Sequence, residues 1–150
     1  MKTLRRFSSK VRLPGILSDI DGVVYRGGSE IGSSASVIKA LLNQPARDKC
    51  RVPFALLTNG GGIPEGERAD YINKVIGLKA GRVLTREDMI LCHTPFRGES
   101  LLSKYRDSYV LVSGHGRMID LAKLYGYKKA IDIEELFSLY PQLAPVKLAQ

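Results

Sequence analysis

One stretch decides the fold of this chain: Ile16-Leu17-Ser18-Asp19-Ile20-Asp21-Gly22-Val23-Val24-Tyr25, an apolar strand that runs directly into two carboxylates and a glycine. Side chains two residues apart point the same way from an extended backbone, so Asp19 and Asp21 can converge on one ligand. Two like charges in one place are costly unless a cation or a shared proton relieves them, and a divalent metal held by carboxylate oxygens is the usual relief. The stretch therefore predicts a metal site, and the alternative is an acid-rich turn closed by Gly22.

A second stretch of the same kind reads Val52-Pro53-Phe54-Ala55-Leu56-Leu57-Thr58-Asn59-Gly60-Gly61-Gly62. Its apolar run predicts another strand, and Pro64, with acids directly after it, marks the start of a helix. Because a helix N-terminus attracts anions, we expect Thr58, Asn59 and the Gly60 amide to hold phosphate oxygens. Glycines at this point let the backbone approach a ligand closely and adopt positive φ. Taken alone, the same residues are also typical of a simple turn.

The remaining sequence alternates strand and helix signals. Apolar residues at helical spacing predict helices over 33–43 and 64–76, and a short strand follows at 89–92. A helix at 99–105, a strand at 109–113, a helix at 118–125 and a brief strand near 130 come next. The inward-facing stripes of the first two helices are Val37, Ile38, Leu41 and Leu42, then Ala69, Ile72, Val75 and Ile76. This order is typical of an α/β fold with a parallel sheet flanked by helices.

Three further motifs follow in order: Cys92-His93-Thr94-Pro95-Phe96, Tyr109-Val110-Leu111-Val112-Ser113-Gly114-His115-Gly116 and Leu124-Tyr125-Gly126-Tyr127. With the two stretches above, they resemble the haloacid dehalogenase superfamily of phosphotransferases. The first motif of that superfamily reads Asp-x-Asp-Gly after a strand, and its second is a Ser or Thr at the end of a neighbouring strand. Within the superfamily, the set looks like class IIA and is closest to the cat eye syndrome critical region protein 5 type. The resemblance covers about residues 13–148 and implies a Rossmann-like core with an α/β cap.

The resemblance implies a role for each matching residue. Asp19 corresponds to the nucleophile that becomes an aspartyl phosphate, and Asp21 to the acid/base that protonates the leaving oxygen and then activates water. Mg²⁺ would be bound by Asp19 and by the main-chain carbonyl of Asp21. Thr58, with its own amide or that of Asn59, would hold the transferring phosphoryl oxygens. Residues 23–28 would form the flap that gates the site.

The sequence departs from the family pattern in its later motifs. No Gly-Asp pair occurs, and Lys128, Lys129 and Lys147 do not match the lysine of the third motif. Because the chain stops at Gln150, inside the implied cap, we expect an N-terminal fragment, a truncated product or a degenerate homologue. The expected division is a basic segment at 1–12, the N-terminal part of the core at 13–93 and the start of the cap at 94–150. We expect low stability and little or no turnover from this chain alone.

Basic residues gather near the N-terminus. The chain holds 23 lysines and arginines against 15 acids, and five of those basic residues precede Asp19, so the remainder accounts for only +3 of the net charge of +8. Residues 1–10 are typical of a mitochondrial presequence and equally of a short basic tail, so the expected location is mitochondrial, otherwise cytoplasmic. The sequence contains no recognisable nucleic-acid module or membrane span. Cys50 and Cys92 lack the spacing of a disulfide framework or a zinc site.

Three classes of function share parts of this pattern. The first is a Mg²⁺-dependent phosphatase for a small phosphorylated metabolite, with a link to glycerophospholipid metabolism that comes from family association alone. The second is a non-catalytic binding or assembly subunit of a mitochondrial complex. The third, a receiver-type signalling domain, fails because receivers take their metal-binding acids from an earlier strand end. Oligomerisation through the cap is compatible with the first two classes.

Several other features are expected to be structural. Gly114-His115-Gly116 is interpreted as a turn, because the third glycine of a dinucleotide fingerprint is missing. His93 is expected to be a substrate-side or structural contact between core and cap. Tyr125, Tyr127 and Tyr140 are expected to pack with their hydroxyls reaching solvent.

Overall fold

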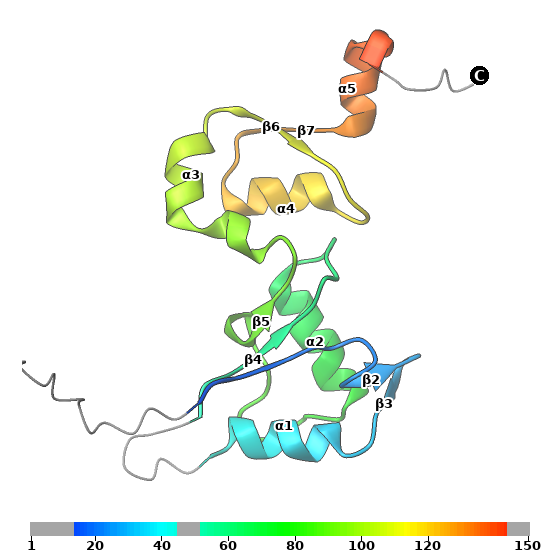
Figure 1. Ribbon diagram of the computed structural model, residues 1–150, viewed down its shortest axis with the longest axis vertical. Helices are drawn as coiled ribbons and strands as arrows, with labels where there is room; N and C mark the ends of the chain where they lie inside the picture. The colour runs from blue at the N-terminus through cyan, green and yellow to red at the C-terminus, as the bar shows by residue number, and fades with distance from the viewer. Residues whose placement is uncertain (1–13, 45–51, 144–150) are drawn as a thin grey trace, which may run out of the picture.

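The computed structural model describes residues 14–44 and 52–143, so the predicted presequence at 1–10 and Cys50 lie outside the described residues. The strands are β1 (Ile16–Ser18), β2 (Tyr25–Arg26), β3 (Ser29–Glu30), β4 (Phe54–Leu57), β5 (Met89–Ile90), β6 (Tyr109–Val112) and β7 (Lys129–Asp132). The α-helices are α1 (Ser34–Leu42), α2 (Glu65–Val75), α3 (Glu99–Tyr105), α4 (Met118–Tyr125) and α5 (Ile133–Leu139). Short 3-10 helices occupy Arg86–Asp88, Thr94–Arg97 and Pro141–Leu143. Figure 1 shows two groups of elements, a lower group from β1 to β5 and an upper group from α3 to α5.

The lower group contains a parallel sheet of three strands in the order β1-β4-β5. Ser18 pairs with Leu56 on one side of β4, and Leu56 pairs with Met89 on the other. Helices connect the strands, as the alternating sequence pattern predicts, and the predicted fold class is confirmed. Since parallel strands end at the same edge of a sheet, the residues that follow β1 and β4 are brought together there.

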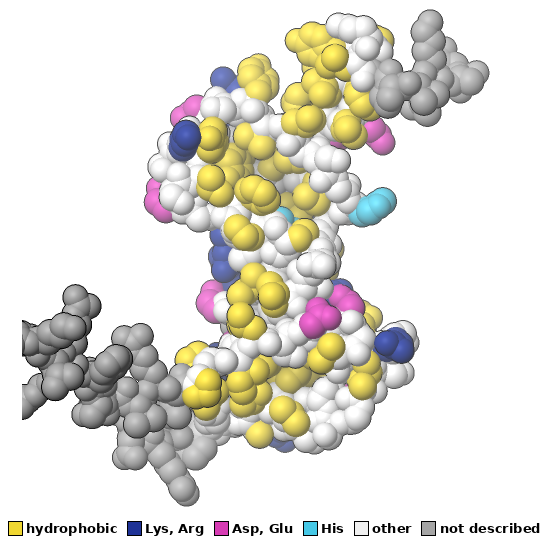
Figure 2. Space-filling view, viewed as in Figure 1, with side chains coloured by type: hydrophobic (Ala, Val, Ile, Leu, Met, Phe, Trp, Pro, Cys, Tyr) yellow, Lys and Arg dark blue, Asp and Glu magenta, His cyan; other side chains and the backbone are white. Residues whose placement is uncertain are grey.

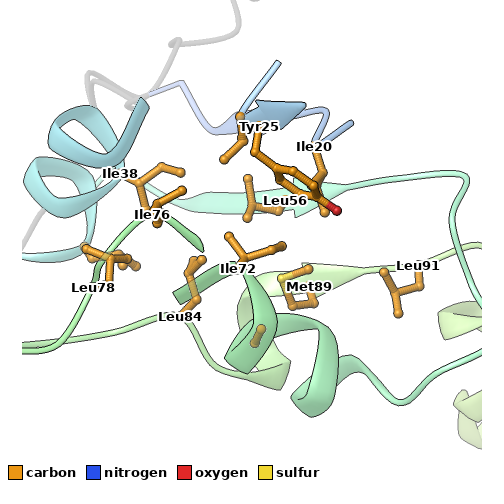
Figure 3. Close-up of a cluster of buried hydrophobic side chains, with 13 residues drawn as sticks. Ile20, Tyr25, Ile38, Leu56, Ile72, Ile76, Leu78, Leu84, Met89 and Leu91 are labelled. Carbon is orange, nitrogen blue, oxygen red and sulfur yellow. The ribbon is translucent and has the colours of Figure 1, made fainter. Parts of the chain in front are cut away.

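A single apolar cluster holds the sheet against α1 and α2. Leu56 at the centre of the sheet and Ile72 of α2 are both fully buried, and Figure 3 shows them facing each other within this cluster. The predicted stripe of α2 is confirmed, and the helix is followed by Gly77 at a φ of +67°, a conformation that favours glycine. The prediction for α1 is wrong at one position: Ile38 and Leu42 are buried, but Val37 is exposed. A nine-residue helix at the margin of the sheet buries a narrower stripe than the sequence suggests.

A small hairpin follows β1. Strands β2 and β3 pair antiparallel, with Tyr25 opposite Glu30, across the region where the sequence predicts a flap. The Ser34 hydroxyl donates to the Val24 carbonyl over 2.8 Å and fixes the hairpin to the start of α1. Val24 and Tyr25 are buried in the core cluster, so the base of the hairpin is anchored.

The upper group contains a second parallel pair of strands, β6 and β7, joined by α4. The bounds of α3 and α4 are those predicted, and Gly126 ends α4 in the left-handed conformation with a φ of +103°. The next helix, α5, is capped by Asp132, whose side chain accepts a hydrogen bond of 2.7 Å from the Glu135 amide. The two strands predicted for this part of the chain are present as β6 and β7.

Apolar side chains remain on the surface of both groups, as Figure 2 shows. Within the described sheet β1 is an edge strand, and its Leu17 is 65% exposed. An open apolar edge of this kind favours association with other chains, so the expected low stability stays a prediction. None of the described helices is long and apolar enough to cross a membrane.

Candidate functional site

The polar residues that follow β1 and β4 meet at one edge of the sheet. Thr58 Oγ1 donates to Asp21 Oδ2 over 3.1 Å, and the Gly60 amide donates to Thr58 Oγ1 over 3.0 Å. Thr58 is buried, and its own amide donates to the Ile90 carbonyl of β5 over 3.0 Å. Three of the predicted site residues, Asp21, Thr58 and Gly60, thus form one hydrogen-bonded chain.

The two acids have different surroundings. Asp19 is exposed, and its carboxylate makes no hydrogen bond or ion pair with the described residues. Ile20 between the acids is fully buried and anchors the turn in the core. Asn59 is exposed beside the Thr58 side chain, and within 14–44 and 52–143 its amide group has no hydrogen-bond partner. The structure therefore leaves the proposed nucleophile accessible and engages the proposed acid/base.

Arg68 is a site residue that the sequence interpretation missed. Its Nη2 lies 3.0 Å from each carboxylate oxygen of Asp21, and its guanidinium lies 5.7 Å from the ring centre of Tyr25 and 5.9 Å from that of Tyr71. Burial raises the pKa of Tyr25, the Arg68 charge opposes that rise and the Asp21 carboxylate adds to it. A basic residue in the first turns of the helix after the glycine loop was the available signal.

The three glycines at 60–62 pack closely against different neighbours. A Cβ on Gly60 would meet Thr58 Oγ1 at 3.3 Å, whereas a Cβ on Gly61 would lie 2.6 Å from Cys92 Sγ. Gly62 alone has a positive φ, +82°, and a Cβ there would overlap the carbonyl oxygen of His115. The expected positive φ is confirmed at Gly62, and Gly61 and Gly62 are also required by packing against other loops, while the close approach to a ligand stays a prediction.

A buried polar network lies beside this loop, between the two groups of elements. Glu65 of α2 accepts hydrogen bonds from the Thr94 hydroxyl at 2.9 Å and the Tyr125 hydroxyl at 2.8 Å, and Tyr125 also contacts His93 Nδ1 at 2.6 Å. Arg97 Nη1 lies 3.5 Å from the same Glu65 oxygen. The expectation that the Tyr125 hydroxyl reaches solvent is wrong, since α4 packs that hydroxyl onto α2. The Tyr127 hydroxyl is likewise engaged, donating to the Phe96 carbonyl over 2.7 Å.

The charges of this network fix its proton positions. Burial raises the pKa of Glu65, but hydrogen bonds from its own amide, Tyr125 and Thr94, with the Arg97 charge, together lower it below the ordinary value. Burial and the neighbouring Glu65 carboxylate raise the pKa of Tyr125 above its ordinary value. Because the Tyr125 proton goes to Glu65, His93 Nδ1 is the donor to the Tyr125 oxygen. His93 therefore joins the groups structurally, as one of its two expected roles requires.

Replacing Tyr125 by phenylalanine should destabilise the chain. The change leaves the buried His93 Nδ1 without a partner and removes one donor from Glu65, which should lower the free energy of unfolding by about 1–3 kcal/mol. Urea unfolding followed by circular dichroism measures the loss. Tyr140→Phe is the matched control, because Tyr140 is half exposed and its hydroxyl has no partner among the described residues. Equal unfolding midpoints for the two variants would contradict the network.

Glu65 should make stability depend on pH in a defined direction. Its pKa in the folded chain lies below the ordinary 4.5, so its contribution is complete above 4.5 and is lost as the pH falls from 4.5 through the lower pKa of the folded chain. The destabilisation caused by Glu65→Gln should therefore stay constant from about pH 7 down to about pH 5 and shrink as the pH falls further, from about pH 4.5 to about pH 3. Urea midpoints of both proteins across this range give the answer. A difference that stays constant with pH would rule out this contribution.

The described residues offer donors for a metal ion that takes few ligands from the protein. No group of three or more metal-ligating side chains lies together within the described residues. Mg²⁺ commonly uses one or two carboxylates together with substrate phosphate and water. The unpaired Asp19 carboxylate fits that requirement. So does the main-chain carbonyl of Asp21, which accepts no hydrogen bond from the described residues.

The chain is similar in sequence to known proteins. Residues 16–128 match the family described as haloacid dehalogenase-like hydrolase. A cardiolipin synthase (CMP-forming) / mitochondrial hydrolase fusion protein of Schizosaccharomyces pombe is 33% identical over 137 residues, covering 87% of this chain and 21% of that protein. A mitochondrial hydrolase of Saccharomyces cerevisiae is 29% identical over 127 residues, covering 85% of this chain and 32% of that protein. The chain thus spans about a fifth and about a third of the length of these curated relatives.

Two solved structures share the fold. A hypothetical protein from Pyrococcus horikoshii OT3 superposes with a TM-score of 0.57 at 21% identity, covering 84% of this chain and 43% of that one. NagD from E. coli K-12 superposes with a TM-score of 0.56 at 17% identity, covering 80% of this chain and 46% of that one. At these identities the likeness concerns the arrangement of elements.

Proposed function

The chain belongs to the haloacid dehalogenase-like hydrolases, and we propose that it is the N-terminal part of a Mg²⁺-dependent phosphatase that acts through an aspartyl phosphate on a small phosphorylated metabolite. The observation that carries the proposal is the Thr58–Asp21 hydrogen bond of 3.1 Å, which joins the ends of two neighbouring parallel strands beside an unpaired Asp19. An exposed carboxylate directly after β1, the strand that Asp21 also follows, can attack a phosphoryl group held at the loop that starts at Thr58.

The proposed reaction has two displacements at phosphorus. An Asp19 oxygen attacks, the ester P–O bond breaks, and Asp21 gives a proton to the leaving oxygen. Asp21 then takes a proton from a water whose oxygen attacks phosphorus, the bond between phosphorus and the Asp19 oxygen breaks, and phosphate leaves with Asp19 regenerated. The Thr58 hydroxyl would turn from Asp21 to hold one nonbridging oxygen, with the Gly60 amide orienting it, and the amide group of Asn59, which has no partner among the described residues, would hold another. Mg²⁺ held by Asp19 and the Asp21 carbonyl would neutralise phosphate charge.

We propose the class IIA assignment, and within it the cat eye syndrome critical region protein 5 type, on the ordered motifs between residues 16 and 127. The same assignment divides the chain into a core part at 13–93 and the start of a cap at 94–150. Two relatives carry the words mitochondrial hydrolase in their names, which supports a mitochondrial location with residues 1–12 as the leading segment. The fused cardiolipin synthase of one relative supports a role near glycerophospholipid metabolism.

A non-catalytic binding or assembly subunit of a mitochondrial complex is the second candidate. It is favoured by the Arg68–Asp21 pair, which engages the proposed acid/base in an ion pair. The two candidates differ in whether Asp19 reacts. A subunit that only binds partners needs no reactive carboxylate at this position.

Beryllium fluoride tests the proposal, because with Mg²⁺ it forms a stable mimic of aspartyl phosphate. We expect ¹⁹F nuclear magnetic resonance of the full chain to show a bound resonance when both beryllium fluoride and Mg²⁺ are present. The resonance should disappear when a chelator removes Mg²⁺. A chain that gives no bound resonance in the presence of both would favour the assembly subunit.

A further inference from the structure

Arg68 brings a permanent positive charge to the ends of β1 and β4. It is the fourth residue of α2, and its Nη2 contacts both oxygens of Asp21 at 3.0 Å. A Cβ atom on Gly60 would lie 3.8 Å from that Nη2 and 3.3 Å from Thr58 Oγ1. The guanidinium and the Thr58 hydroxyl therefore flank the same point, on the side of the loop where phosphate oxygens are proposed to bind.

Two tyrosine rings hold the Arg68 side chain in place. Tyr25 and Tyr71 pack edge to face with ring centres 5.7 Å apart, and the guanidinium contacts both rings. Tyr25 is buried in the core cluster, and the Arg68 side chain is only 18% exposed. Since the Arg68 side chain is already ordered, it loses little conformational freedom when an anion binds.

The contact with Asp21 leaves hydrogen-bond donors of the Arg68 guanidinium without acceptors among the described residues. A guanidinium carries five N–H donors, yet among the described residues only Nη2 has hydrogen-bond partners, and Nε is buried without one. Its Nη2 is shared between two oxygens, whereas a well-matched carboxylate takes two parallel bonds from two nitrogens. Buried donors without partners are rare in folded proteins and call for an explanation. A tetrahedral oxyanion beside Gly60 would lie close to Nη2 and would add an acceptor for the guanidinium.

We propose that Arg68 binds an oxygen of the phosphoryl group and that it makes this site a receptor for phosphomonoester dianions and related tetrahedral oxyanions, even without a divalent cation. The inference rests on the proposed function and adds a binding residue to it. Arg68 offsets the Asp21 charge through the ion pair between them. When a dianion enters, Arg68 shares its donors between Asp21 and the anion, so a doubly charged group can approach two carboxylates without full repulsion.

Tungstate, a tetrahedral dianion that undergoes no transfer, tests this role by isothermal titration calorimetry of the full chain in the presence of a chelator. Wild type should bind tungstate, and Arg68→Met should bind at least about tenfold more weakly, as expected for the loss of one charge-assisted hydrogen bond. Arg68→Lys keeps the charge without the planar fork and should bind with intermediate affinity. Circular dichroism verifies that each variant is folded.

Two further variants separate a specific contact from net charge. Lys74→Met removes the same charge from the exposed side of α2 and should leave tungstate affinity unchanged. Asp21→Asn removes the competing carboxylate and should tighten binding several-fold. The proposal is overturned if wild type binds no tungstate, if Arg68→Met binds as tightly as wild type, or if Asp21→Asn weakens binding.

The two proposals can fail separately. Tungstate binding that depends on Arg68, without a beryllium fluoride resonance, keeps the oxyanion site and removes the catalytic proposal. A beryllium fluoride resonance without Arg68-dependent tungstate binding keeps the catalytic proposal and removes Arg68 as its binding residue.

Discussion

Replacing Gly62 by alanine should lower the free energy of unfolding by at least about 2–3 kcal/mol. Gly62 has a φ of +82°, where a side chain is strained, and its Cβ would overlap the carbonyl oxygen of His115. The His115 carbonyl cannot move aside easily, because it belongs to the main chain rather than to a flexible side chain. Urea unfolding with linear extrapolation measures the change.

Gly66→Ala is the matched control for this substitution. Gly66 lies in α2, has an ordinary φ and would place its Cβ in open space. Alanine there should stabilise the chain by up to about 1 kcal/mol, because glycine is a poor helix residue. If both alanines gave the same small change, the close approach of the two loops would be wrong.

The Gly62 position matters because it joins the two groups of elements. The Gly62 carbonyl accepts a hydrogen bond of 2.9 Å from the Arg117 amide, and a Cβ on Gly116 would lie 2.6 Å from the same carbonyl oxygen. Arg117 also forms an ion pair with Glu67 of α2. The loop that follows Thr58 therefore serves the candidate site at one end and supports the loop before α4 at the other.

Asparagine in place of Asp19 should remove the bound beryllium fluoride resonance completely. The amide cannot form the bond to beryllium that a carboxylate forms, and it keeps nearly the same shape, so the fold should be unchanged. Asp70→Asn is the control, because Asp70 is exposed on α2 and loses the same charge. The ¹⁹F spectra of wild type and both variants, recorded with Mg²⁺, give the comparison. A resonance of equal intensity in Asp19→Asn would remove Asp19 from the reaction.

The sequence predicted the elements well because their signals are local. The bounds of α3 and α4 follow from apolar spacing and flanking polar residues, and Gly77 and Gly126 end their helices with the positive φ that glycine allows. The parallel order of β1, β4 and β5 follows from the alternation of strand and helix. The neighbourhood of Asp21 and Thr58 follows from that order, because both residues come after a strand.

The contacts that the sequence did not predict are long-range. Tyr125 belongs to an amphipathic helix, and its position in the apolar stripe predicts that it packs. The stripe does not predict that Glu65 and His93 are its hydrogen-bond partners. The position of Arg68 in a helix is likewise predictable from the sequence. Its hydrogen bond to Asp21 is not, because that contact depends on how α2 crosses the sheet. The second role of Gly62 depends on a loop 53 residues away, around His115.

Chemical trapping tests the nucleophile most directly. The full chain is incubated with acetyl phosphate and Mg²⁺ and is then reduced with borohydride, which converts an aspartyl phosphate into homoserine. Mass spectrometry of the digested protein should find homoserine at position 19 and unmodified aspartate at position 21. No homoserine, or homoserine at a different aspartate, would contradict a phosphoryl-transfer site built on Asp19 at the ends of β1 and β4.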